Sequence, residues 1–90
     1  MTTIAVNGVL DFDTVPLVWK NTLAEFRQCS AIELDLSAVT QCNSAALALL
    51  LEWVRLAARL QKKLTIRHLP ERLRVISSAC GIARLPGVSP

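Results

Sequence analysis

The segment from Ile32 to Arg59 constrains the fold of this chain more than any other. It reads IELDLSAVTQCNSAALALLLEWVRLAAR, an alternating apolar and acidic stretch followed by small polar residues and then by an Ala- and Leu-rich run. Alternation of period two predicts a strand, and the Ala- and Leu-rich run without Gly or Pro predicts a helix. A strand, a short polar turn and a long helix in direct succession are typical of an α/β domain.

The predicted helix runs from Ser44 to Lys63, after a strand over 31–36 and a polar loop over 37–43. On a helical wheel its apolar residues fill an arc of about 220°, and a helix that lies on one sheet needs around half of that. The surplus apolar surface is expected to meet a neighbouring helix or a partner. The arc comprises Leu47, Leu49, Leu50, Leu51, Trp53, Val54, Leu56, Ala57, Ala58 and Leu60.

The N-terminal segment alternates weakly and contains the dipeptide Asn7-Gly8. Both residue types tolerate positive φ, so the dipeptide predicts a two-residue hairpin turn between strands over 4–6 and 9–12.

The next element is predicted to be a helix that ends near Gln28, with Pro16 in its first turn. Asp13 or Thr14 is expected to cap it. Its core face is expected to contain Val15, Val18, Trp19, Leu23 and Phe26.

Beyond the long helix, the pattern predicts a strand over 64–67, a third helix that starts near Pro70 and ends at Gly81, and an optional edge strand over 82–85. Ninety residues favour a single domain, residues 1–90. The expected order is therefore β-β-α-β-α-β-α-(β), with three helices and a mixed sheet of four to five strands.

Composition and charge distribution restrict the partners of the chain. Hydrophobic residues make up 52% of it and aromatic residues 4%, with a mean hydropathy of +0.42, so the apolar excess is aliphatic. Up to Leu51 two basic residues stand against five acidic ones, a net charge of −3; from Glu52 onward eight stand against two, a net charge of +6. Such asymmetry suits an acidic protein, a nucleic acid or an anionic membrane surface.

Nucleic-acid binding is not expected, because the basic half contains a single aromatic residue, Trp53, and it falls in the apolar arc. Membrane insertion is not expected either, since the longest nearly apolar run, 45–51, is much shorter than the roughly 20 residues that a span requires. A peripheral contact with anionic lipid through Arg55, Arg59, Lys62 and Lys63 remains an alternative. The first ten residues do not have the pattern of a secretion signal, so a cytoplasmic location is expected.

Residues suited to catalysis or metal binding are sparse. His68 is the single histidine, and the three cysteines, Cys29, Cys42 and Cys80, lack the paired spacing of zinc sites. Three glycines in separate places form no phosphate-binding loop. We therefore expect no enzyme activity, no cofactor and no metal.

The polar turn from Thr40 to Ser44 is the strongest candidate for a functional site. Asn43 or Ser44 can cap the helix with a side-chain oxygen, which explains one residue of the turn. The adjacent Ala45 and Ala46 predict a low-relief surface around a hydroxyl group, which lets the backbone of another protein approach closely. Free N–H groups and the helix dipole would also tolerate a phosphate on that hydroxyl.

At these residues, IELDLSAVTQCNSAALALL, the sequence resembles STAS domains, the fold of anti-sigma factor antagonists and of sulfate-transporter tails. These domains typically have a strand ending in Leu-Asp-Leu-Ser, a nearby Val, then Asp-Ser or Asp-Thr, small residues and a Leu-rich helix. The continuation ALALLLEWVRLAARLQKKLTIRHLPERLRVISSACGI resembles the small MlaB-type members. The resemblance covers essentially the whole chain and implies a STAS fold.

This resemblance places Ser44 where the family has a Ser or Thr that is phosphorylated or contacts a partner. Asn43 replaces the usual Asp, which weakens the case for a phosphorylation switch and affects a plain docking surface much less.

MlaB-type proteins are non-catalytic subunits of a phospholipid ABC transporter and bind its ATPase, MlaF, so the resemblance implies a module that stabilises or regulates such an ATPase at the inner membrane. The alternative is an anti-sigma factor antagonist regulated by phosphorylation of Ser44. The residues expected to contact the partner are Thr40, Gln41, Asn43, Ser44, Ala45, Leu47 and Ala48, with Trp53 and Arg55 nearby.

Overall fold

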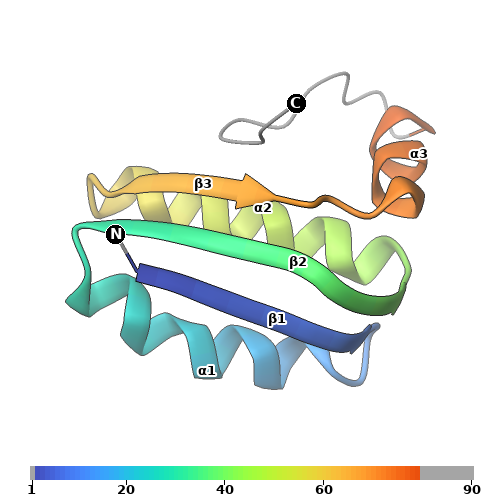
Figure 1. The fold of residues 1–90 in the computed structure, drawn as a ribbon, viewed down its shortest axis with the longest axis horizontal. Helices are drawn as coiled ribbons and strands as arrows, with labels where there is room; N and C mark the ends of the chain where they lie inside the picture. The colour runs from blue at the N-terminus through green and yellow to red at the C-terminus, as the bar shows by residue number, and fades with distance from the viewer. Residues whose placement is uncertain (1, 80–90) are drawn as a thin grey trace.

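The computed structural model describes residues 2–79 and shows one three-stranded parallel sheet in the order β1-β2-β3, with helices between the strands (Figure 1). Each strand is followed by a helix, as the alternation of patterns predicts for an α/β domain. The elements are β1 (Thr2–Leu10), α1 (Val15–Gln28), β2 (Ala31–Cys42), α2 (Ser44–Arg59), β3 (Lys63–Arg67) and α3 (Glu71–Ala79).

The core lies between the sheet and the helices. Figure 1 shows α2 running behind β2 and β3, α1 along the outer side of β1, and α3 near the far end of β3. Ile32, Leu34 and Ile66 have no exposed surface, whereas Glu33 and Arg67 alternate with them and form an ion pair of 2.8 Å on the opposite face. One face of the sheet is therefore apolar and covered, and the other is polar.

The indole of Trp53 occupies the centre of this core, without exposed surface. Its Nε1 donates a hydrogen bond of 2.9 Å to Oγ1 of Thr22 on α1. The Thr22 hydroxyl in turn lies 3.0 Å from the carbonyl oxygen of Val18 and donates to the backbone of its own helix. The buried polar groups of the two helices thus satisfy one another, as a core of low dielectric constant requires.

The predicted N-terminal hairpin is wrong, because β1 is one continuous strand from Thr2 to Leu10. Its pairing with β2 shifts register between Ala5 and Asn7 and again between Gly8 and Val9, and Gly8 has a φ of 80°. The Asn-Gly dipeptide therefore lies inside a continuous edge strand, where Gly8 adopts the positive φ without a steric cost, and the extra residue at each register shift belongs to β2. The sheet gains a longer parallel pairing with β2 than two short strands would give.

The predicted polar loop over 37–43 is also wrong, because β2 continues to Cys42. Asp35 is the last β2 residue paired with β3, so residues beyond it have β1 as their strand neighbour on one side only. Exposed polar side chains are tolerated at such a one-sided position. Pairing with β1 therefore extends the strand past the point where its hydrophobic alternation stops.

The α/β class and the three helices are confirmed, whereas the mixed sheet of four to five strands is corrected to three parallel strands within residues 2–79. Helix α2 ends at Arg59 rather than Lys63, because Leu60 caps it and Gln61 takes a positive φ of 56°. The predicted helix end at Gly81 and the optional strand over 82–85 lie outside the described residues.

The wide apolar arc of α2 is covered by three neighbours. Helix α2 packs on the sheet and contacts α1 on one side and α3 on the other. Within the arc every residue except Ala58 is buried or half-buried. The surplus apolar surface inferred from the sequence thus meets neighbouring helices, and the large apolar side chains of α2 are all buried or half-buried.

Candidate docking surface

The candidate site lies at the carboxyl edge of the sheet, where parallel strands end and helices begin. Two contacts hold this edge together. The backbone N–H of Asn43 donates to the carbonyl oxygen of Leu10 at 3.2 Å, which joins the start of α2 to the end of β1. Nε of Arg72 on α3 donates to the carbonyl oxygen of Cys42 at 2.9 Å. The start of α2 is therefore fixed between the first and last parts of the described chain.

Asn43 caps α2. Its backbone is extended, and its Oδ1 accepts a hydrogen bond of 2.9 Å from the backbone N–H of Ala45. This is the geometry that the sequence predicts for Asn43 as the cap. Since Asn43 performs the capping, the hydroxyl of the following residue, Ser44, is not needed for it and lies on an exposed residue.

Five of the six exposed residues of α2 follow one line along the helix, which we call the α2 stripe; the sixth, Ala58, lies beside it. Spacings of four and three residues place the five within an arc of about 80° on a helical wheel. At its middle, Nη1 of Arg55 pairs with Oε1 of Glu52 at 2.8 Å, and both side chains are largely in solvent. The stripe consists of Ser44, Ala48, Glu52, Arg55 and Arg59.

A groove of about 260 Å³ runs beside the α2 stripe, between α1 and α2. Its lining is mostly apolar and includes the half-buried ring of Trp19. The sequence assigned Trp19 to the core and Pro16 only to the first turn of its helix, because helical spacing does not show which helix lies alongside. The groove is lined by Val15, Pro16, Trp19, Ala48, Leu49 and Glu52.

Most of the predicted contact residues gather at this edge. Ser44, Ala48 and Arg55 lie on the α2 stripe, and Asn43 is half-buried beside it. Thr40 and Gln41 are exposed at the end of β2. They line a separate hollow of about 340 Å³ together with Cys42 and Arg72.

Three residues that the sequence predicted to contact a partner are buried, so that prediction does not fit their positions. Trp53, Ala45 and Leu47 are 0%, 4% and 6% exposed, and all three belong to the core. Trp53 follows Ser44 by nine residues, which places it on the opposite side of the helix at about 100° per residue. A partner on the α2 stripe therefore does not reach the side chain of Trp53.

Two titratable groups near the edge have shifted pKa values. The backbone N–H of Ser37 donates to Oδ1 of Asp35 at 2.9 Å and, with the Ser37 hydroxyl and the nearby His68, holds the pKa of that carboxyl below its usual value. Burial raises the pKa of the Cys42 thiol, although the positive charge of Arg72 opposes the change. Cys42 therefore stays protonated at neutral pH and is a poor nucleophile.

Within the described part of the chain, no group of three or more His, Cys, Asp or Glu side chains lies close enough together to hold a metal ion. Within residues 2–79, no helix has the length and hydropathy that a membrane span requires.

Comparison with known proteins identifies the family of the chain and a solved structure with a similar fold. A family model described as "Mlab, STAS domain" matches residues 1–87. The structure also matches that of the anti-sigma factor antagonist SpoIIAA in its unphosphorylated form, with a TM-score of 0.73 and 16% sequence identity over 98% of this chain and 77% of that one. At 16% sequence identity, the structural similarity to SpoIIAA shows only that the two proteins share a fold. No curated protein matches the sequence.

Proposed function

Since this chain belongs to the MlaB family of STAS domains, we propose that it docks on the ATPase subunit of a Mla-type phospholipid ABC transporter and stabilises or regulates that ATPase. STAS domains are protein-interaction modules. In this proposal the chain is non-catalytic, lies in the cytoplasm, and reaches the inner membrane through its partner rather than by touching lipid. The observation that carries the proposal is the α2 stripe.

The two ends of the α2 stripe suit different parts of an interface. At its start, Ser44 and Ala48 are small, so the backbone of a partner helix or loop can approach α2 closely. Further along, Arg55 and Arg59 provide positive charge that attracts an acidic partner and sets the orientation of docking. Beside the stripe, the ring of Trp19 offers the half-exposed aromatic surface that interfaces often use as an anchor.

A direct binding measurement tests this proposal. We expect the purified chain to form a complex with a MlaF-like ATPase, and the Ser44→Arg substitution to weaken it by about tenfold or more, because a long charged side chain would separate the two surfaces. Ser30→Arg is the matched control, since Ser30 is also exposed but lies at the other end of the 12-residue strand β2. Equal affinities for the two variants would exclude the α2 stripe as the interface.

A second candidate function is an anti-sigma factor antagonist regulated by phosphorylation of Ser44. Its support is the exposed position of Ser44 at the N-terminus of α2, where a phosphate is electrostatically favourable. Asn43 stands where the family has an acid, which favours constitutive docking over a switch. Intact mass after incubation with an anti-sigma kinase distinguishes the two, because the switch requires addition of one phosphate that the Ser44→Ala variant does not acquire.

A further inference from the structure

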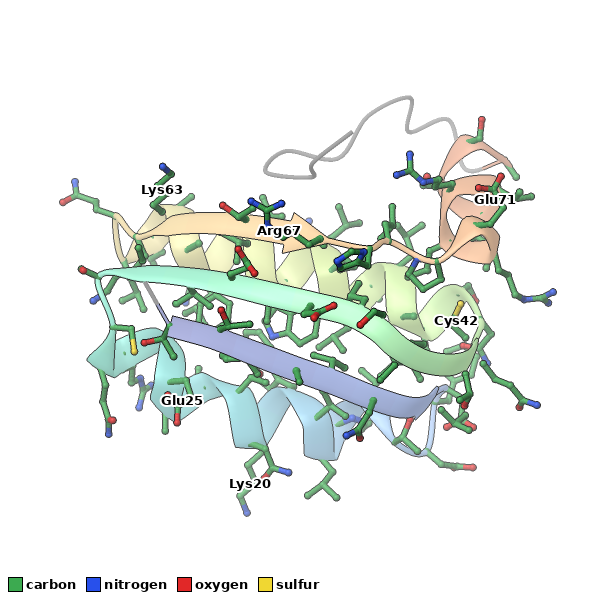
Figure 2. The ribbon with its side chains drawn as sticks, viewed as in Figure 1. Lys20, Glu25, Cys42, Lys63, Arg67 and Glu71 are labelled. Carbon is green, nitrogen blue, oxygen red and sulfur yellow. The ribbon has the colours of Figure 1, made fainter. Side chains whose placement is uncertain are left out.

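The two edge strands of the sheet differ in how they are protected against pairing with another chain. Strand β3 has five residues and carries Lys63 and Arg67 near its ends (Figure 2). Strand β1 has nine residues and contains no charged residue and no proline. Short length, charge and proline are the usual devices that keep an edge strand from pairing. Strand β1 has none of these three devices, and its pairing with β2 keeps a continuous register from Thr2 to Ala5.

A groove of about 430 Å³ runs along the unpaired edge of β1, between that strand and α1. Within residues 2–79 no strand pairs with this edge. Figure 1 shows α1 following the outer side of β1, and residues of both elements line the groove. The groove is lined by residues Thr2, Thr3, Ile4, Ala5, Val6 and Asn7 of β1 and by Val18, Asn21, Thr22 and Glu25 of α1.

We propose that an extended peptide segment of a partner protein enters this groove and pairs with Thr2–Val6 as a fourth strand of the sheet. In such strand addition the main chain supplies the hydrogen bonds, and alternate side chains of the peptide enter the groove and determine specificity. Here the inward side chains would be apolar or small where they meet Val18 and Thr22. A basic side chain would lie near Glu25, the one charged residue in the lining.

A partner peptide fits this groove better than a second copy of the chain does. Two copies that paired through their β1 edges would bring both α1 helices to the same place, because α1 extends along the outer side of β1 (Figure 1). The segment Thr2–Val6 also offers no basic residue to Glu25. The inference is independent of docking through α2, since this groove and the groove beside the α2 stripe involve different residues of α1.

A displayed library of random peptides of about ten residues tests the proposal without any ATPase. Asn21→Trp fills the groove from the exposed surface of α1 and leaves β1 unchanged, and Lys20→Trp is the matched control, because Lys20 projects from α1 away from the sheet (Figure 2). We expect selected peptides to alternate apolar and polar residues, to include a basic residue, and to bind Asn21→Trp at least about tenfold more weakly than Lys20→Trp. Amide exchange should slow at Thr2–Val6 in the complex.

Several results would overturn the proposal. They are a library that yields no binder, binders that tolerate Asn21→Trp, and binders that slow amide exchange on α2 instead of β1. Dimerisation of the free chain that Asn21→Trp abolishes would assign the groove to a second copy. Unchanged unfolding midpoints for both tryptophan variants establish that any loss of binding comes from the filled groove. A second selection against Glu25→Lys should enrich acidic residues in place of basic ones.

Discussion

Helices α1 and α2 belong to the same layer and have similar lengths, 14 and 16 residues, yet α2 has eight buried residues and α1 has two. Helix α2 packs on the sheet and against both other helices, whereas α1 lies at the edge of the sheet and is bordered by a groove on each side. Helix α2 also has the higher apolar content, with twelve Ala, Val, Leu or Trp residues out of 16 against seven such residues or Phe out of 14 in α1, so content and central position together make it the core helix. Helix α2 supplies most of the buried residues of the two helices, and α1 lines both grooves.

The largest expected difference between the two helices comes from their tryptophans. Trp53 on α2 is fully buried, and Trp19 on α1 is half-buried. We expect Trp53→Ala to lower the free energy of unfolding by about 3–5 kcal/mol, through lost apolar contacts and the cavity left behind. Trp19→Ala should cost about half of that or less, because its groove side is already open to solvent. Urea denaturation of both variants measures the difference, and equal losses would contradict the contrast between the helices.

The hydrogen bond from Trp53 to Thr22 is where the two helices depend on each other. Thr22→Val keeps the shape of the side chain but leaves the indole N–H of Trp53 without its acceptor, at a distance of 2.9 Å in the native protein. We expect a loss of about 1–3 kcal/mol in unfolding free energy, the usual cost of an unpaired buried donor. Thr22→Ser, which retains the hydroxyl, is the control. If Thr22→Val and Thr22→Ser lower the unfolding free energy by the same amount, the Thr22 hydroxyl contributes to stability only through its packing.

The smallest expected effect concerns the helix starts. Asn43 accepts a hydrogen bond from the Ala45 N–H, whereas Thr14 at the start of α1 makes no side-chain cap. Asn43→Ala should therefore destabilise the protein by about 1 kcal/mol, and Asn43→Asp, which keeps the acceptor oxygen, should restore most of that. Thermal unfolding measures both. An unchanged midpoint in Asn43→Ala would mean that α2 is held by packing alone.

The helices and the first half of β2 followed from local patterns. Spacing along α2 predicted its apolar arc, because one turn of helix relates residues only three or four apart. The same reasoning placed Trp53 correctly in the apolar arc. Including it among the partner contacts was wrong because nearness to Ser44 in the sequence was taken for nearness on the surface.

Tertiary structure decided what depends on residues far apart in the chain. Asn7-Gly8 suits a hairpin turn by its local conformational preference, and pairing with β2 keeps it inside a continuous strand. Residues 37–42 lack a strand pattern and become a strand because β1 lies beside them. The side chain of Trp19 is only half-buried because α1 lies at the edge of the sheet. Periodicity shows which side of a helix or strand is apolar. The neighbour that covers that side is determined by contacts between distant segments, and such contacts leave no pattern in a local window of the sequence.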